Sequence, residues 1–322
     1  MIKRNQYIDV LRGMTILVVV FGHAIQVTNH GDNSVPIHLI MQSFQMALLM
    51  IISGYVMGYS KIEANYKNAI LKRVNRLFVP YIVWEQINYF LKLKRGGESF
   101  TVKSYFGELL WSEFWFLRIL FFLCIVYILY VKVSSKSKQR LERVFLIVMV
   151  FCIVFLCSLI KGLENLRLYS LYFAMGNTLY HLKKSGRLNK GIEKVLASIA
   201  LIVFTICIYT YFLITIPMWR WVAFKLMGIV GSISFASIAI YVNRLKRLSK
   251  ALSWIGKNTL PIYAIHWCLL FSLDIPELWK IAEKIPFYIT CTFGFFLWII
   301  ICYGLIVLFK KNKLTKRLLC GE

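Results

Sequence analysis

The sequence predicts an all-α polytopic integral membrane protein, a bundle of about ten transmembrane helices with both termini in the cytoplasm. Of its 322 residues, 59% are hydrophobic and 16% are charged, whereas a typical soluble domain is about 25% charged. Apolar runs of about 20 residues, the length that crosses roughly 30 Å of hydrocarbon, recur between short polar segments. The expected spans are residues 9–28, 38–59, 76–93, 113–131, 144–160, 167–181, 195–214, 218–241, 254–273 and 286–309.

Basic residues are concentrated at alternate ends of these spans. The formal net charge is +25, and 28 of the 39 Lys and Arg residues lie in or next to the two terminal segments and every second loop. Cytoplasmic loops carry such an excess, so both termini are expected on the cytoplasmic side. Membrane topology therefore accounts for the positive net charge, and no nucleic-acid partner is expected. We expect the chain in the cell membrane, the plasma membrane of a bacterium, in contact with membrane lipids.

The segments between the spans are short. The longest external one, residues 92–112, cannot hold a separate domain, so residues 1–322 are expected to form a single transmembrane domain with no appended soluble domain. The eight cysteines lie mostly within apolar runs and form no C-x-x-C pair, so no disulfide or metal site is expected. His30 and His38 flank the first external loop and are interpreted as loop residues.

The first predicted span contains a cation and an imidazole. Arg12 and His23 are eleven residues apart, which puts them within about 20° of the same helical face and about 16 Å apart along the axis. Ionisable residues inside a membrane are functional candidates by default. Two simpler interpretations stay open: Arg12 as an interfacial cation held by Asp9, one turn earlier, and His23 as a hydrogen-bonding packing residue.

The third predicted span begins with two arginines and contains one carboxylate. Arg73 and Arg76 are one helical turn apart at its cytoplasmic start, where any span attracts basic residues. Glu85 lies about 13 Å further in, where an unpaired carboxylate is costly. It therefore needs a polar partner, and His23 is the natural one. A structural hydrogen bond and a catalytic dyad are equally open interpretations.

The ninth predicted span adds a second imidazole. It runs outward from the cytoplasm, so His266 lies about ten residues in, near the expected depth of His23 and Glu85. Tyr263 is one turn earlier on the same side of the helix. An aromatic, polar contact between helices is the alternative to a catalytic role.

Five short motifs follow one another along these spans: D-x-L-R-G with a histidine that follows the arginine after ten intervening residues, I-S-G-Y, R-x-x-R-L-x-x-P-Y, F-W-F-L and G-x-x-T-x-x-x-Y-x-x-H. Each is weak alone, but in this order they resemble the membrane acyltransferase-3 family over nearly the whole chain. The first and third motifs look most like the branch of fucose 4-O-acetylase-like carbohydrate O-acetyltransferases. The family more often has serine at Thr259, and both residues supply a hydroxyl. The motif residues are Asp9, Leu11, Arg12, Gly13, His23, residues 52–55, Arg73, Arg76, Leu77, Pro80, Tyr81, residues 114–117, Gly256, Thr259, Tyr263 and His266.

The resemblance implies a membrane-embedded O-acyltransferase, in most members an O-acetyltransferase. Such an enzyme moves an acyl group from cytoplasmic acyl-coenzyme A to a hydroxyl of a cell-surface or lipid-linked carbohydrate, such as a polysaccharide of the cell envelope. The implied donor co-substrate is acetyl-CoA, and no metal is implied. The resemblance also implies that Arg12 and His23 are essential, and that Arg73 and Arg76 help to bind the donor.

The chemistry of these residues suggests a role for each. Arginines suit the phosphates of coenzyme A because a guanidinium donates paired charge-assisted hydrogen bonds, which favours donor binding by Arg12, Arg73 and Arg76. His23 is expected to be the general base that takes the proton of the acceptor hydroxyl near pH 7. We expect direct transfer, with an acyl-histidine intermediate as the open alternative.

The remaining polar residues are expected to assist. Glu85 would orient His23, and Tyr263, Thr259 or His266 would polarise the thioester carbonyl or position the acceptor. The residues expected to support the site are Asp9, Ser53 and Thr259.

Two other classes of protein fit part of this pattern. An exporter or flippase of a glycan or lipid-linked sugar would also have about ten spans with buried polar groups, although the internal repeats and broken helices of many transporters are not evident here. A non-catalytic membrane partner in an envelope assembly is the third interpretation. The order of the motifs favours the enzyme.

Overall fold

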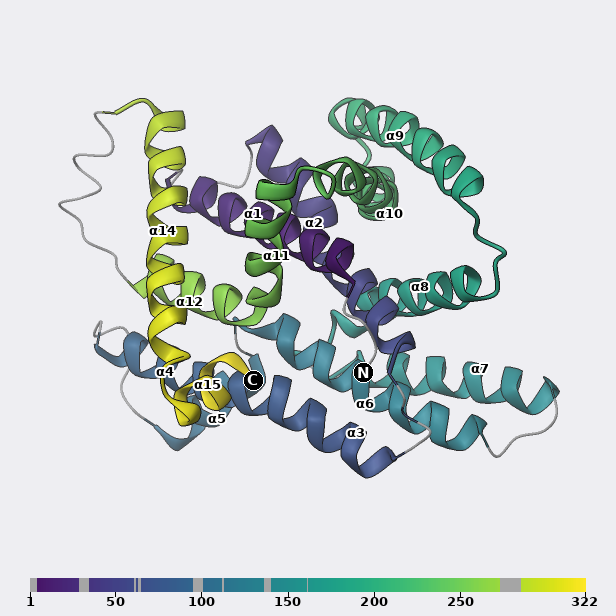
Figure 1. Ribbon diagram of the computed structural model, residues 1–322, viewed down its shortest axis with the longest axis horizontal. Helices are drawn as coiled ribbons and strands as arrows, with labels where there is room; N and C mark the ends of the chain where they lie inside the picture. Colours follow the sequence, from purple (N-terminus) through teal and green to yellow (C-terminus); the bar gives the residue numbers. More distant parts are fainter. Residues whose placement is uncertain are drawn as a thin grey trace. The chain divides into compact units, whose positions relative to one another are not determined.

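The computed structural model describes residues 5–28, 35–60, 62, 65–94, 101–111, 113–135, 140–160, 162–272 and 285–322, and all regular structure in these ranges is helical (Figure 1). This agrees with the predicted all-α class. The helices are α1 (Gln6–Thr28), α2 (Pro36–Gly58), α3 (Tyr66–Arg73), the π-helical η1 (Val74–Phe78), α4 (Val79–Lys94), α5 (Val102–Trp111), α6 (Trp115–Ser134), α7 (Arg140–Cys157), α8 (Leu166–Lys184), α9 (Lys190–Leu213), α10 (Pro217–Val242), α11 (Lys246–Lys257), α12 (Thr259–Ser272), α14 (Phe287–Phe309) and α15 (Lys313–Cys320).

Six of the described helices are long and apolar enough to cross a membrane: α1, α2, α6, α9 from Gly191 onward, α10 and α14. A further helix, α12, is apolar but shorter. Few side chains of α9 and α14 are buried although these helices are strongly apolar, an arrangement typical of helices that face lipid. The prediction of a helical membrane protein is confirmed, whereas the number of ten spans and the cytoplasmic position of the termini stay predictions.

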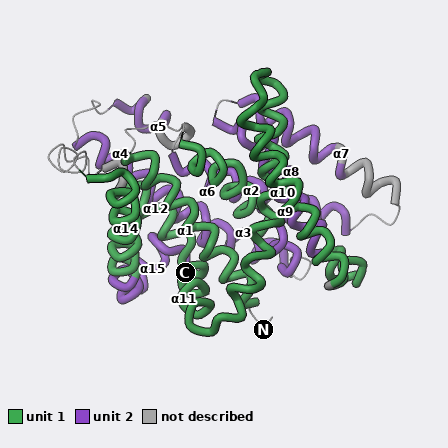
Figure 2. Tube along the Cα trace, turned by 90° about the horizontal axis from the view of Figure 1, so that it is seen from above, with its two compact units in different colours: residues 1–52, 181–306 green, residues 53–180, 307–322 purple. Residues whose placement is uncertain are grey.

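The chain divides into two compact units (Figure 2). Unit 1 consists of residues 1–52 and 181–306, and unit 2 of residues 53–180 and 307–322. The predicted site residues are therefore divided as well. Unit 1 contains Asp9, Arg12, His23, Thr259, Tyr263 and His266, and unit 2 contains Ser53, Arg73, Arg76 and Glu85. Each unit is described by itself below.

In unit 1, α1 and α11 approach so closely that backbone meets backbone. A methyl group added at Gly13 would overlap the carbonyl oxygen of Leu252, and one added at Gly256 would overlap the carbonyl oxygen of Asp9. Small residues permit such close helix approach in membrane proteins. The crossing fixes the first turns of α1, which carry Asp9 and Arg12, against α11.

This crossing predicts the effect of one added methyl group. We expect Gly256→Ala to destabilise the folded protein by about 1–3 kcal/mol, because the new methyl has backbone atoms as its neighbours and these cannot rotate away. The thermal unfolding of purified protein in detergent measures the change. The matched control is Gly304→Ala, since no heavy atom lies within 4 Å of a methyl added at Gly304. An equal melting temperature for the two variants would contradict the close crossing.

The ninth predicted span is not one helix. Residues 254–273 were expected to be continuous, but α11 ends at Lys257 and α12 begins at Thr259, with Asn258 between them. The physical reason is Pro261, which has no N–H to donate to the Lys257 carbonyl and is tolerated only in the first turn of a helix. The Asn258 side chain occupies the break and donates from Nδ2 to the Trp254 carbonyl at 2.7 Å. The prediction of a single helix here was wrong.

In unit 2, the helix that carries the third predicted span begins ten residues before that span, because α3, η1 and α4 follow one another without a break. In η1 the Val79 N–H donates to the Val74 carbonyl, five residues earlier, as in a π-helical turn. Pro80 lies directly after it and has no N–H for the Arg76 carbonyl. The two basic motif residues are thus placed at a local widening of the helix, a feature often found at functional sites.

Candidate functional site

Two histidine rings lie together in unit 1. His23 is on α1 and His266 is on α12, and their ring centroids are 5.4 Å apart with an angle of 35° between the planes. α12 packs against α1, which brings the two helices to this distance. His266 is fully buried and His23 is half-buried. His23 is therefore the partly exposed member of the pair, and His266 is enclosed.

The hydrogen bonding of His266 defines its tautomer. Its Nδ1 lies 2.7 Å from the Ile262 carbonyl oxygen, which can only accept, so Nδ1 carries the proton. In the neutral ring Nε2 then has a lone pair. This atom is buried and has no hydrogen-bond partner among the described residues. His266 can therefore accept a hydrogen bond at Nε2 but cannot donate one from it.

His23 is oriented from two sides. Its Nδ1 lies 3.1 Å from Oε1 of Gln26, one turn further along α1. Because this amide oxygen accepts, the proton of the neutral ring is on Nδ1 and the basic nitrogen is Nε2. The Trp267 ring meets the His23 ring edge to face, with centroids 5.0 Å apart. Both contacts hold the imidazole in one orientation.

Tyr263 and Thr259 differ in their relation to this pair. The Tyr263 ring is buried with its centroid 6.0 Å from that of His266. Thr259 instead donates from Oγ1 to the Gly256 carbonyl at 2.8 Å, across the break between α11 and α12. It lies about 10 Å from His266 by helical rise. The structure thus brings Tyr263, but not Thr259, to the histidines.

Arg12 and Asp9 lie at the other end of α1. Arg12 is half-buried and Asp9 is buried at the crossing with α11. The separation of Arg12 from His23 along the helix is about 16 Å, as expected from the sequence. The arginine therefore does not contact the histidine pair.

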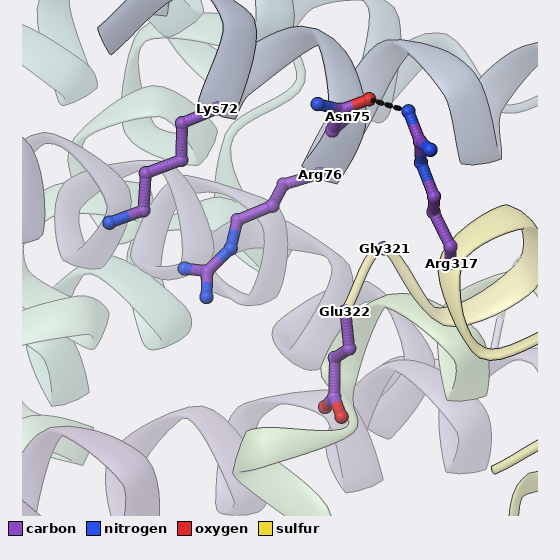
Figure 3. Close-up of a pocket in the computed structure, with 6 residues that line it drawn as sticks. All are labelled: Lys72, Asn75, Arg76, Arg317, Gly321 and Glu322. Carbon is purple, nitrogen blue, oxygen red and sulfur yellow. Dashed lines mark hydrogen bonds between the residues drawn. The ribbon is translucent and has the colours of Figure 1, made fainter. Parts of the chain in front are cut away.

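Unit 2 contains a basic pocket of about 270 Å³ (Figure 3). Arg317 donates from Nη2 to Oδ1 of Asn75 at 2.9 Å. Glu322 accepts from Lys310 at 2.8 Å and lies 3.7 Å from Lys316, so its negative charge is already matched and the pocket keeps an excess of positive charge. The lining residues, which we call the basic pocket, are Lys72, Asn75, Arg76, Arg317, Gly321 and Glu322.

A glycine fixes the far wall of the basic pocket. Gly321 has φ = +68°, in the left-handed region, where a Cβ is unfavourable. A methyl group added there would also lie 2.5 Å from the Arg76 carbonyl oxygen, the same carbonyl that Pro80 leaves without a helical donor. Trp84 donates from Nε1 to the Leu319 carbonyl at 2.9 Å, which holds the end of α15 against α4.

Position 321 therefore has a predicted phenotype. We expect Gly321→Ala to push α15 away from η1, to displace Arg317 and to weaken the binding of an anionic ligand in the basic pocket. Gly186→Ala is the matched control, because Gly186 has a similar φ of +73° but no heavy atom within 4 Å of an added methyl. Titration with adenosine 3′,5′-bisphosphate measures the difference. Equal affinities for the two variants would exclude the proposed contact of residue 321 with Arg76.

The two arginines of the third-span motif have different surroundings. Arg73 donates from Nη2 to Oγ of Ser60 at 2.8 Å and does not line the basic pocket. Arg76 lines it and has no ion pair in the part of the chain that the structure describes. Partial burial, with repulsion from Arg76 and Arg73, lowers the pKa of Lys72. A cation held under such repulsion favours an anionic ligand.

Glu85 and Ser53 are also in unit 2. The Glu85 side chain is buried within α4, and Asn88, one turn further on, is buried as well. Ser53 is half-buried on α2, next to Gly54, whose backbone packs against the Phe173 carbonyl. Because His23 belongs to unit 1, the predicted contact between His23 and Glu85 stays a prediction.

Sequence reasoning missed three polar residues that the structure places at these sites. His38, interpreted as a loop residue, is buried in the first turn of α2, and this interpretation was wrong. Gln45 is buried on the same face of α2; the spacing of seven residues in an apolar run was the available signal. The sequence contains no signal for Arg317, because only the packing of α15 brings this residue to the basic pocket. His30 lies outside the described residues.

The fold and these sites define a class: a helical membrane protein with a histidine pair inside one unit and a basic pocket of about 270 Å³ in the other. Among the described residues, no three His, Cys, Asp or Glu side chains are grouped as a metal site would require. The groups that the two sites contain are the imidazoles of His23 and His266 and the cationic side chains of the basic pocket.

A family model described as an acyltransferase domain matches residues 5–304, nearly the whole chain. The chain belongs to the acyltransferase-3 family that its motifs resemble, and the match supports a membrane acyltransferase. No curated protein and no solved structure matches the chain. The family match favours the enzyme over the exporter and over a non-catalytic partner.

Proposed function

We propose that this protein is an O-acetyltransferase of the fucose 4-O-acetylase-like branch, which moves an acetyl group from cytoplasmic acetyl-CoA to a hydroxyl of a cell-surface or lipid-linked carbohydrate. The five ordered motifs support the branch and the substrates. The excess of Lys and Arg in alternate loops supports ten spans with both termini on the cytoplasmic side of a bacterial plasma membrane.

The observation that carries the proposal is the orientation of His23. Gln26 accepts from Nδ1, so the neutral ring has its lone pair on Nε2, and the half-buried ring can meet a second molecule. A positioned imidazole is well suited to take a proton from a hydroxyl near neutral pH.

In the proposed reaction His23 Nε2 takes the proton of the acceptor hydroxyl. The hydroxyl oxygen attacks the thioester carbonyl carbon, a C–O bond forms and the C–S bond breaks. The thiolate of coenzyme A leaves and takes the proton back from His23, so that the ester and the free thiol are the products. No acyl-histidine is needed, although attack by Nε2 itself is the alternative that the test must separate.

The tautomer of His266 narrows its role. Polarising the thioester carbonyl requires a donor, and the only N–H of neutral His266 is directed to the Ile262 carbonyl. His266 Nε2 can instead accept a hydrogen bond from a hydroxyl group. As an acceptor it also stabilises the imidazolium that forms on His23. Tyr263, whose phenol can donate, is the better residue for the carbonyl oxygen as negative charge develops on it.

Donor binding is assigned to the basic residues. Lys72, Arg76 and Arg317 of the basic pocket suit the phosphate groups of coenzyme A, because guanidinium groups bind phosphate through paired charged hydrogen bonds. Arg73 contributes positive charge from its position beside Ser60. Arg12 is proposed as a further cation for the donor, with Asp9 and Ser53 as supporting residues and Glu85 as the group that orients His23.

The test uses purified protein with radiolabelled acetyl-CoA, with and without a panel of methyl glycosides as acceptors. We expect slow donor hydrolysis without acceptor and faster transfer of label to at least one glycoside. Acid-quenched protein should carry no label on His23 if transfer is direct. Absence of donor binding would contradict the proposal and would favour the exporter, a class in which helix breaks such as that at Asn258 are common.

A further inference from the structure

A second set of polar groups faces α1 immediately beside His23. A methyl group added at Gly22 would lie 3.4 Å from Gln45 Oε1 and 3.7 Å from His38 Nδ1. These two side chains are seven residues apart on α2, which places them on one face of the helix. The missing side chain of Gly22 therefore lets both polar groups reach the backbone of α1 next to the base.

Both side chains are buried without adequate hydrogen bonding. His38 is 3% and Gln45 is 5% exposed. The Gly22 backbone is close enough to interact with the His38 ring. Even so, no hydrogen bond of ordinary geometry joins either ring nitrogen of His38, or Oε1 of Gln45, to any described residue. A buried polar atom left without a partner costs about 1–3 kcal/mol. Ser43, on the same helix, avoids this cost by donating to the Ile40 carbonyl at 2.7 Å.

The polar atoms that lack partners suit a ligand rich in hydroxyl groups. His38 can donate from one ring nitrogen and accept at the other, and Gln45 can accept at Oε1. A sugar hydroxyl also donates and accepts, so vicinal hydroxyls can satisfy this set. His38 lies in the first turn of α2 and His23 in the last third of α1, which ends at Thr28. In the proposed topology these parts of the helices lie toward the outer side, from which the acceptor enters.

We propose that His38 and Gln45 form a subsite that binds the hydroxyls of the carbohydrate acceptor next to the one that is acylated. This inference rests on the proposed function, because it assigns the acceptor of the same reaction. The subsite would select acceptors by the position of their neighbouring hydroxyls, since an acceptor without them leaves buried groups unpaired, and such sites reject analogues that lack the hydroxyl strongly.

The test removes the polar groups and keeps the shape. We expect His38→Phe and Gln45→Leu each to raise KM for a methyl glycoside acceptor at least tenfold, while kcat changes less than threefold and KM for acetyl-CoA stays within threefold. Melting temperatures should stay equal to or above the wild-type value, because unsatisfied buried groups are removed. Ser43→Ala is the control and should leave both KM values unchanged. If only the KM for acetyl-CoA changed, His38 and Gln45 would be assigned to binding the pantetheine arm of the donor, and the proposal would be overturned.

Gly22→Ala provides a second, independent variant. The nearest atom to the new methyl would be 3.4 Å away, so the fold should accept it, but the methyl occupies the space that the polar groups face. We expect the acceptor KM to rise at least tenfold. The methyl glycoside alone should raise the melting temperature of the wild type and not of these three variants. This binding measurement needs no turnover, so it tests the acceptor subsite even if the acetyl-transfer proposal fails. Equal shifts of the melting temperature in the wild type and the three variants would overturn the subsite.

Discussion

Replacing His23 by alanine is expected to abolish acyl transfer while the protein remains folded and inserted in the membrane. Loss of a positioned general base typically lowers a rate by about 10²–10⁴-fold. His23 contacts Gln26 through Nδ1 and the Trp267 ring through its own ring, so its loss removes the base and leaves the backbone of α1 in place. Transfer of label from acetyl-CoA to a glycoside, at saturating concentrations of both, measures the effect.

The control is the exposed His181 at the end of α8, whose replacement by alanine should leave turnover unchanged. Size-exclusion chromatography establishes that both variants are folded, and binding of acetyl-CoA to His23→Ala should stay within threefold of the wild type. More than a tenth of wild-type turnover in His23→Ala would show that another group takes the proton, and His266 would be the next residue to test.

Arg76→Gln is expected to raise KM for acetyl-CoA by about 10–100-fold with little change in kcat, because a charged hydrogen bond to phosphate contributes about 1.5–3 kcal/mol. Arg76→Lys should restore part of the loss, since lysine supplies the charge without the planar fork. The variant should also show a weaker dependence of KM on salt concentration, as one charged contact is gone.

Arg187→Gln, on an exposed part of the chain between α8 and α9, is the matched control for a lost positive charge. Its KM for acetyl-CoA should remain within twofold of the wild-type value. A lowered kcat with an unchanged KM in Arg76→Gln would place Arg76 outside the donor site and remove the role proposed for the basic pocket.

The helices could be located from sequence because an apolar run of membrane length is a local property of the chain. The break at Asn258 was missed because Pro261 lies inside an apolar run, and hydrophobicity alone does not reveal that its backbone N–H is missing. The length of the run suggested one span, whereas the backbone hydrogen bonds require two helices.

The site could be predicted only in part. His23, Tyr263 and His266 lie in motifs at helical spacing, and the structure brings their rings together. His38 and Gln45 also have helical spacing, yet the position of His38 beside a loop concealed it. Their proximity to His23 depends on how α2 packs on α1.

The basic pocket depends still more on tertiary structure. Arg76 and Arg317 are far apart in the sequence, and no local pattern relates α15 to η1. The π-helical turn at residues 74–78 is equally hidden, since a proline after a helical turn can produce a kink, a cap or a bulge.

One geometric consequence follows from the unbroken helix formed by α3, η1 and α4. Lys72, Asn75 and Arg76 are on the same rod as Glu85, which lies about 13 Å along its axis from Arg76. The number of residues between Arg76 and Glu85 therefore fixes how far the buried carboxylate lies from the basic pocket along the axis. The residue that the π-helical turn accommodates in η1 is part of that spacing.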